Sequence, residues 1–107
     1  MIFIETPQFC AWRERNLDDR EFQALQIRLI ADPRAGDLIR GTHGLRKVRI
    51  PLRGRGRRGG GRVIYCWWTR EERCYLLYGY AKSEQSDLTA AQLRRLARAM
   101  IEEMKDG

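Results

Sequence analysis

The sequence predicts an α/β fold of the α+β type: a twisted, mainly antiparallel sheet combined with two N-terminal helices and one C-terminal helix. Two observations predict it. Apolar residues recur at helical spacing near both ends of the chain, whereas the middle contains alternating or β-branched and aromatic stretches. A chain of 107 residues can bury one modest core, so residues 1–107 are expected to form a single domain.

The first third of the chain favours one strand and two helices. The apolar run MIFIE suits an opening strand, and the Thr6 and Pro7 that follow are typical of a helix start. This helix is expected to end near Asn16. A second helix should begin at Asp18 and end before Pro33, with one apolar stripe made of Phe22, Leu25, Leu29 and Ile30.

The remaining elements are three strands and a helix. From Leu45 the apolar spacing changes to two, which predicts a strand with an apolar face of Val48, Ile50 and Leu52 and a cationic face of Lys47, Arg49 and Arg53. The stretches RVIYCWWT and CYLLYGYA predict an antiparallel hairpin. Thr89 and Gln92 fit a capping box, and they precede an amphipathic helix.

Positive charge is concentrated in the middle of the chain. The formal net charge is +7, and the stretch from Arg40 to Arg62 contains nine Lys or Arg residues and no acid. Seven of the ten glycines lie between Gly41 and Gly61, so the loop over about 53–61 is expected to be flexible as well as cationic. A basic, flexible loop beside a cationic strand favours a phosphate backbone as the ligand.

Several classes of site are disfavoured. The three cysteines show no C-x-x-C spacing, the single histidine cannot build a metal site alone, and no acidic cluster suits Mg²⁺, so no metal and no cofactor are expected. No apolar stretch is long enough for a membrane span and no signal peptide is apparent, which predicts a cytoplasmic protein without a membrane partner. RNA carries its own nucleophile, the 2′-hydroxyl, so cations alone could promote its cleavage. Crowded cations also favour proton loss from a lysine, which makes Lys47 and Lys82 candidates for proton transfer.

Three motifs resemble the HigB-type toxins of type II toxin–antitoxin systems, members of the RelE superfamily. They are G-D-x-I-x-G-T-x-G-L-R-K-x-R from Gly36 to Arg49, R-V-I-Y from Arg62, and Y-x-K-x-E-x-S-D-L from Tyr80 to Leu88. The resemblance implies a compact RelE-like fold. It further implies a metal-independent endoribonuclease that cuts messenger RNA in the ribosomal A site and thereby inhibits translation.

The resemblance also implies roles for particular residues. Arg62 matches an arginine assigned to the scissile phosphate, and Lys82 matches a basic residue after the following strand. Lys47 and Arg49 match the strand that grips the message, with Arg46 beside them, and Tyr80 is placed to stack on a base or donate a hydrogen bond. Strand alternation puts Arg46 on the side of Val48, so a structural role is the alternative for it. The candidate catalytic residues are therefore Arg62, Lys82 and Lys47, and the candidate RNA-binding residues are Arg46, Arg49, Arg53, Arg55, Arg57, Arg58 and Tyr80.

The implied partners are a HigA-type antitoxin with a helix-turn-helix domain, the ribosome and its message. Operator DNA is expected to bind only through the antitoxin complex, because the basic residues of this chain fall on a strand and a loop instead of a recognition helix. One alternative stays open at this point: a non-catalytic module that binds RNA or the ribosome through phosphate contacts.

Overall fold

A computed structural model describes residues 1–53 and 59–106, and it confirms the predicted α+β fold. The strands are β1 (Ile2–Glu5), β2 (Asp37–Leu38), β3 (Leu45–Ile50), β4 (Gly61–Trp68) and β5 (Arg73–Ala81). The helices are α1 (Pro7–Asn16), α2 (Asp19–Ala31), the short 3-10 helix η1 (Thr69–Glu71) and α3 (Ala90–Asp106). Part of the expected Gly/Arg loop, with Arg55, Arg57 and Arg58, lies outside the described residues.

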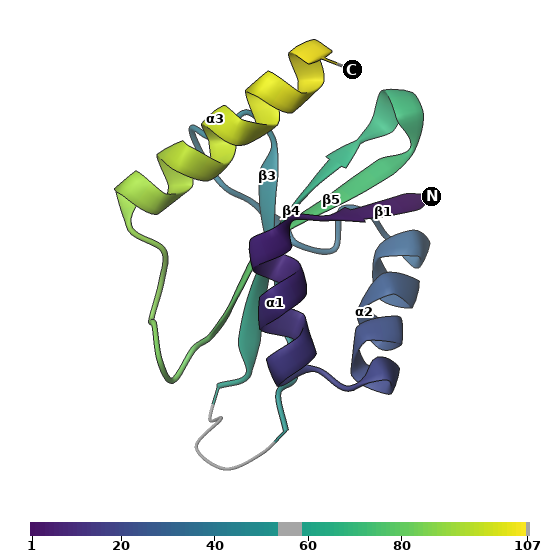
Figure 1. Cartoon of the computed structure of the whole chain (residues 1–107), viewed down its shortest axis with the longest axis vertical. Helices are drawn as coiled ribbons and strands as arrows, with labels where there is room; N and C mark the ends of the chain where they lie inside the picture. The colour runs from purple at the N-terminus through teal and green to yellow at the C-terminus, as the bar shows by residue number, and fades with distance from the viewer. Residues whose placement is uncertain (54–58, 107) are drawn as a thin grey trace.

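The strands form one sheet in the order β1-β5-β4-β3-β2 (Figure 1). The pairs β2–β3, β3–β4 and β4–β5 are antiparallel, which confirms the predicted hairpin of β4 with β5, whereas β1 pairs with β5 in parallel. A register shift interrupts the β4–β5 pairing between Ile64 and Tyr65. The sheet is therefore mixed but mainly antiparallel.

Each main helix begins where a side chain satisfies its free amides. Thr6 caps α1, with Pro7 in the first turn, and Asp18 caps α2 in a capping box completed by Glu21. At α3, Thr89 Oγ1 accepts from Gln92 N and Gln92 Oε1 accepts from Thr89 N, which completes the predicted capping box there. Short polar residues thus set the helix starts that the sequence predicts.

Helices cover both faces of the sheet (Figure 1). On one face α1 and α2 contribute Phe9, Trp12, Leu25 and Leu29 to a core with Val48, Val63, Tyr65 and Leu76. On the other face α3 contributes Ala97 and Met100 to a second core with Leu45, Ile64, Cys66, Tyr75, Leu77 and Tyr80. Strands buried on both sides explain why β4 and β5 read as continuous apolar runs instead of alternating ones.

Two details differ from expectation. Ile30 is 55% exposed, so its assignment to the apolar stripe that faces the core is wrong. Leu25 and Leu29 of the stripe are buried, and Phe22 is partly buried and packs against the same core. The two-residue strand β2, which pairs with Arg46 and Lys47 of β3, was missed because so short a segment carries no periodicity.

Gly79 of β5 lies directly under the ring of Trp12, and a Cβ at this position would clash with that ring. We expect Gly79→Ala to lower the free energy of unfolding by about 1–3 kcal/mol, because the packed indole cannot move away without disturbing α1. Denaturant unfolding would measure this against Gln23→Ala, an exposed change on α2. Equal stability of the two variants would show that α1 shifts freely on the sheet.

Candidate active site

The register of three strands brings cationic side chains to one face of the sheet. Arg49 of β3, Arg62 of β4 and Tyr80 of β5 lie directly opposite one another. Paired residues project to the same face, and so does Lys47, two positions before Arg49 on β3. With Lys82, which follows β5, these cations form what we call the basic cluster: Lys47, Arg49, Arg62 and Lys82.

Arg62 and Lys82 meet at the turn that precedes β4. Arg62 Nη1 donates to the backbone oxygens of Gly59 (3.1 Å) and Gly61 (3.0 Å). The aliphatic part of Lys82 lies against Gly59, and its backbone amide donates to Gly60 O over 2.9 Å. Both of these bonds come from Nη1, and the opposite edge of the guanidinium, formed by Nε and Nη2, is one that can pair with two oxygens of an anion.

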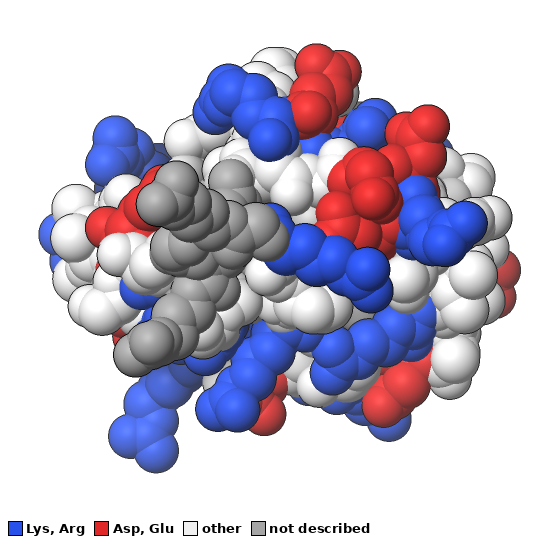
Figure 2. Space-filling view, turned by 90° about the horizontal axis from the view of Figure 1, so that it is seen from below, with Lys and Arg blue, Asp and Glu red and all other residues white. Residues whose placement is uncertain are grey.

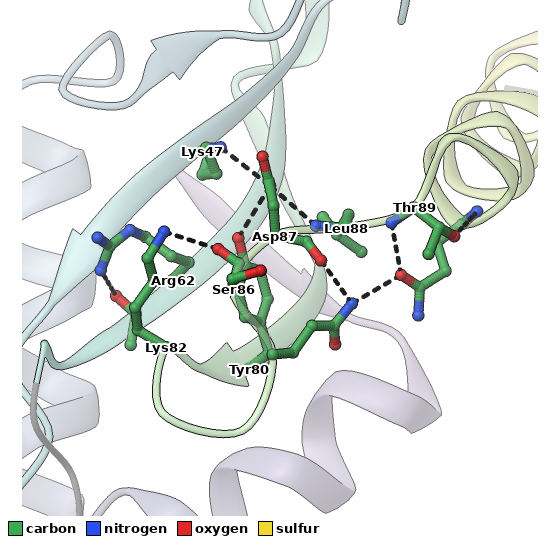
Figure 3. Close-up of polar contacts among 11 residues, drawn as sticks. Lys47, Arg62, Tyr80, Lys82, Ser86, Asp87, Leu88 and Thr89 are labelled. Atoms are coloured by element: carbon green, nitrogen blue, oxygen red, sulfur yellow. Dashed lines mark hydrogen bonds and ion pairs between the residues drawn. The ribbon is translucent and has the colours of Figure 1, made fainter.

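A segment running from Lys82 to Leu88 crosses this end of the sheet before α3 begins (Figure 3). Lys82 Nζ donates to Ser86 O over 2.6 Å. Asp87 Oδ1 accepts from Lys47 Nζ (3.2 Å), Tyr80 OH (3.4 Å) and Leu88 N (2.8 Å). Because Lys47 and Tyr80 belong to the strands on either side of β4, the Asp87 carboxylate lies over β4 itself.

The ionisation of two groups in this region is shifted. Burial, and then the charge of Asp87, raises the pKa of Tyr80 to about 12, although Arg62 opposes the shift. Burial disfavours the ionised form of Asp87, but the Leu88 amide and Lys47 outweigh it and hold the pKa of this carboxyl below its usual value. At neutral pH Tyr80 is therefore a neutral donor and Asp87 an anionic acceptor.

Two candidate residues stand apart from the basic cluster. Arg46 pairs in register with Tyr65 on the α1/α2 side of the sheet, where its Nη1 donates to Gly36 O over 2.8 Å. This position agrees with the structural alternative for Arg46. Arg53 lines a groove of about 410 Å³ beside α2. The strand β3 ends at Ile50, so the strand alternation that predicted Arg53 on the face of Lys47 and Arg49 does not extend to it.

Sequence reasoning missed Asp87. The residue belongs to the Y-x-K-x-E-x-S-D-L motif, but a lone acid in a polar segment carries no signal of the strands that it will contact. Gln85 was missed for the same reason: its Nε2 donates to Asp87 O (3.0 Å) and Gln92 Oε1 (2.7 Å), and its Oε1 accepts from Tyr78 OH (3.3 Å). These bonds join the segment to β5 and α3.

The wider surroundings are cationic as well. Viewed from the end of the molecule that carries this segment, Lys and Arg side chains lie across the surface, with Asp and Glu grouped among them (Figure 2).

Within residues 1–53 and 59–106, no group of three or more His, Cys, Asp or Glu side chains is placed to hold a metal ion. No helix in the described part of the chain is long and apolar enough to cross a membrane.

A family model described as the RelE toxin of the RelE / RelB toxin-antitoxin system matches residues 11–106. The chain belongs to the RelE toxin family. RelE toxins act within toxin–antitoxin systems, so family membership assigns a toxin role to this chain and implies an antitoxin partner. The fold agrees: a mutant of the E. coli toxin RelE, solved in the free state, superposes with a TM-score of 0.61 at 13% identity, covering 94% of this chain and 96% of that chain.

Proposed function

We propose that this RelE-family toxin is a HigB-type messenger RNA endonuclease that acts on translating ribosomes in the cytoplasm. The observation that carries the proposal is the placement of Arg62 and Lys82 against the same turn, next to Lys47 and Arg49 on one sheet face. Several fixed cations around one point suit a phosphate that gains negative charge during a reaction.

In the proposed reaction the RNA supplies both the nucleophile and the leaving group, and these side chains supply positive charge. The 2′-oxygen of the message attacks the adjacent phosphorus and loses its proton, and the bond from phosphorus to the 5′-oxygen breaks. The products are a 2′,3′-cyclic phosphate and a 5′-hydroxyl, which takes up a proton. Arg62 would stabilise the pentacoordinate phosphorane through its Nε–Nη2 edge, and Lys82 would stabilise the departing 5′-oxygen. Lys47 would add charge on the side of the attacking hydroxyl.

Dependence on the ribosome follows from what the cluster lacks. The chain has one histidine, His43, which is exposed in the loop before β3, and the Asp87 carboxylate is a weak base because its pKa is lowered. In-line attack then depends on an outside template that holds the 2′-hydroxyl and phosphate in the reacting geometry. We propose that the ribosomal A site supplies it.

We therefore expect the purified protein to leave naked RNA largely intact and to cut the same message once it is engaged by ribosomes. Mapping of cleaved ends on programmed ribosomes, in parallel with free RNA, would measure this. Efficient cutting of bare RNA would contradict the requirement for a ribosome. Inhibition of translation without any cut message would instead support the second candidate, a non-catalytic RNA- or ribosome-binding module, which the exposed cations also allow.

The proposed partner is a HigA-type antitoxin with a helix-turn-helix domain, and operator DNA would be bound only by the toxin–antitoxin complex. Expression of the toxin alone should stop bacterial growth, and co-expression of the antitoxin should restore it. Normal growth at high levels of the toxin alone would contradict the proposed activity.

A further inference from the structure

Asp87 presents an anion to the surface that is proposed to bind a polyanion. Its carboxylate interacts with Lys47 of the basic cluster and neutralises part of the positive charge there. For RNA binding alone, this is unfavourable, since an anion near a phosphate weakens the attraction of the surrounding cations. A carboxylate in this position therefore calls for a role other than affinity.

The contacts of Asp87 suggest that role. Lys47 is a long, flexible side chain with a partly exposed ammonium group, and Tyr80 is almost fully buried with its hydroxyl at the edge of the cluster. A single oxygen, Asp87 Oδ1, accepts hydrogen bonds from both groups. One acceptor thus fixes the direction of two donors that come from strands on opposite sides of β4.

Asp87 itself is held by the surrounding backbone and side chains. Its Oδ1 accepts from Leu88 N, and its backbone oxygen accepts from Gln85, which is in turn bonded to Tyr78 on β5 and Gln92 on α3. The carboxylate is therefore placed by a sheet strand and a helix, although its side chain is 62% exposed. Such support from a rigid scaffold is what a group needs to position others.

We propose that Asp87 is a positioning residue for RNA cleavage, whose carboxylate holds the Lys47 ammonium and the Tyr80 hydroxyl beside Arg62, where the scissile phosphate would lie. The inference rests on the proposed endonuclease function and adds a residue to it. Asp87 acts through Lys47 and Tyr80, and it contacts neither the phosphate nor the 2′-hydroxyl. Asp87 increases the rate at which bound message is cut, whereas its negative charge slightly weakens the binding of the message.

The test is Asp87→Asn in single-turnover cleavage on programmed ribosomes. Asparagine keeps the acceptor for Leu88 N and removes the charge that orients Lys47. We expect the rate at saturating toxin to fall about ten- to a hundredfold, as for a misplaced reacting group, while half-saturation occurs at the same or a lower concentration. Asp87→Glu, which keeps the charge with a longer reach, should recover part of the rate.

Glu84→Gln is the matched control. Glu84 lies in the same exposed segment, and its side chain forms no hydrogen bond or ion pair with the described residues. The substitution removes the same charge, and it should leave the rate within about twofold, as for an exposed surface change. A rate unchanged in Asp87→Asn, with tighter binding alone, would overturn the proposal and leave Asp87 as a screening charge.

A double-mutant cycle separates positioning from a purely structural role. Asp87→Asn is first introduced into Lys47→Ala, where the effect that remains is the part that Asp87 exerts through Tyr80. It is then introduced into the double variant Lys47→Ala/Tyr80→Phe, where it should slow cleavage by no more than about twofold. Equal losses in every background would mean that Asp87 only holds its own segment, and they would overturn the proposal. If the wild-type toxin cuts no message on ribosomes, the proposed function itself is contradicted. If the wild-type toxin and Asp87→Asn cut equally well, only the inference about Asp87 is contradicted.

Discussion

Replacing Arg62 with alanine is expected to slow cleavage of ribosome-bound message by about a hundred- to a thousandfold. A preorganised donor aimed at developing charge in a water-poor site is typically worth about 3–4 kcal/mol in the transition state, and its loss gives this factor. Arg62 is well placed for that role because two bonds from Nη1 to the Gly59 and Gly61 carbonyls fix the guanidinium. Binding to the ribosome should change far less, since the other cations remain.

Arg62→Lys is the sharper test of the same residue. Lysine keeps the charge but loses the planar fork that pairs with two phosphate oxygens, and it cannot make both carbonyl contacts in the same geometry, so only part of the rate should return. Arg70→Ala, on η1 beyond the opposite end of β4, removes an equal charge away from the cluster and should cut normally. Single-turnover rates, with thermal melts to check folding, would decide; near wild-type rates for Arg62→Ala would contradict this assignment.

Loss of Lys82 should have the second-largest effect, a slowing of about a hundredfold or more. Its ammonium is held by Ser86 O over 2.6 Å, and its stem lies against Gly59, to which Arg62 also bonds. Two cations on one turn can stabilise the phosphorane and the departing 5′-oxygen together. The losses for Arg62→Ala and Lys82→Ala are therefore expected to combine less than additively.

Compared with Lys82→Ala, Lys82→Arg should recover part of the cleavage rate. Arginine keeps the positive charge, but its side chain has a different length and shape. Lys105→Ala on α3, where the lysine is exposed and pairs with Glu102, is the matched control. Rates would be measured as for Arg62. Full activity of Lys82→Ala would move the proposed charge stabilisation to Lys47 and Arg49.

Most of the fold could be predicted from local signals. Capping residues such as Thr6, Asp18 and Thr89 define helix starts within one turn, and aromatic and β-branched runs define β4 and β5. The parallel pairing of β1 with β5 could not be read, because an apolar run says that a strand is buried but not beside which partner it lies. The exposure of Ile30 likewise depends on which neighbours α2 has.

The candidate site was predictable in part. Alternation in β3 separates Lys47 and Arg49 from Arg46, and the structure indeed places Arg46 on the other face. The alignment of Arg49 with Arg62 and Tyr80 required the strand register, which no single segment encodes. The contact of Asp87 with two strands depends on where the connecting segment crosses the sheet, and that path is a property of the assembled fold.

The position of β1 has a consequence for the order of events during synthesis. The hydroxyl of Thr6, just after β1, donates to the carbonyl oxygen of Leu77, 71 positions later in the chain, and β1 lies at the edge of the sheet beside β5. During synthesis the residues of β1 therefore stay without their strand partner until β5 has followed, at roughly 5–20 residues per second. Contacts of such long sequence separation also form slowly. The basic cluster likewise draws on β3, β4 and the segment up to Asp87, so a nascent chain acquires this surface only after Asp87 has been made.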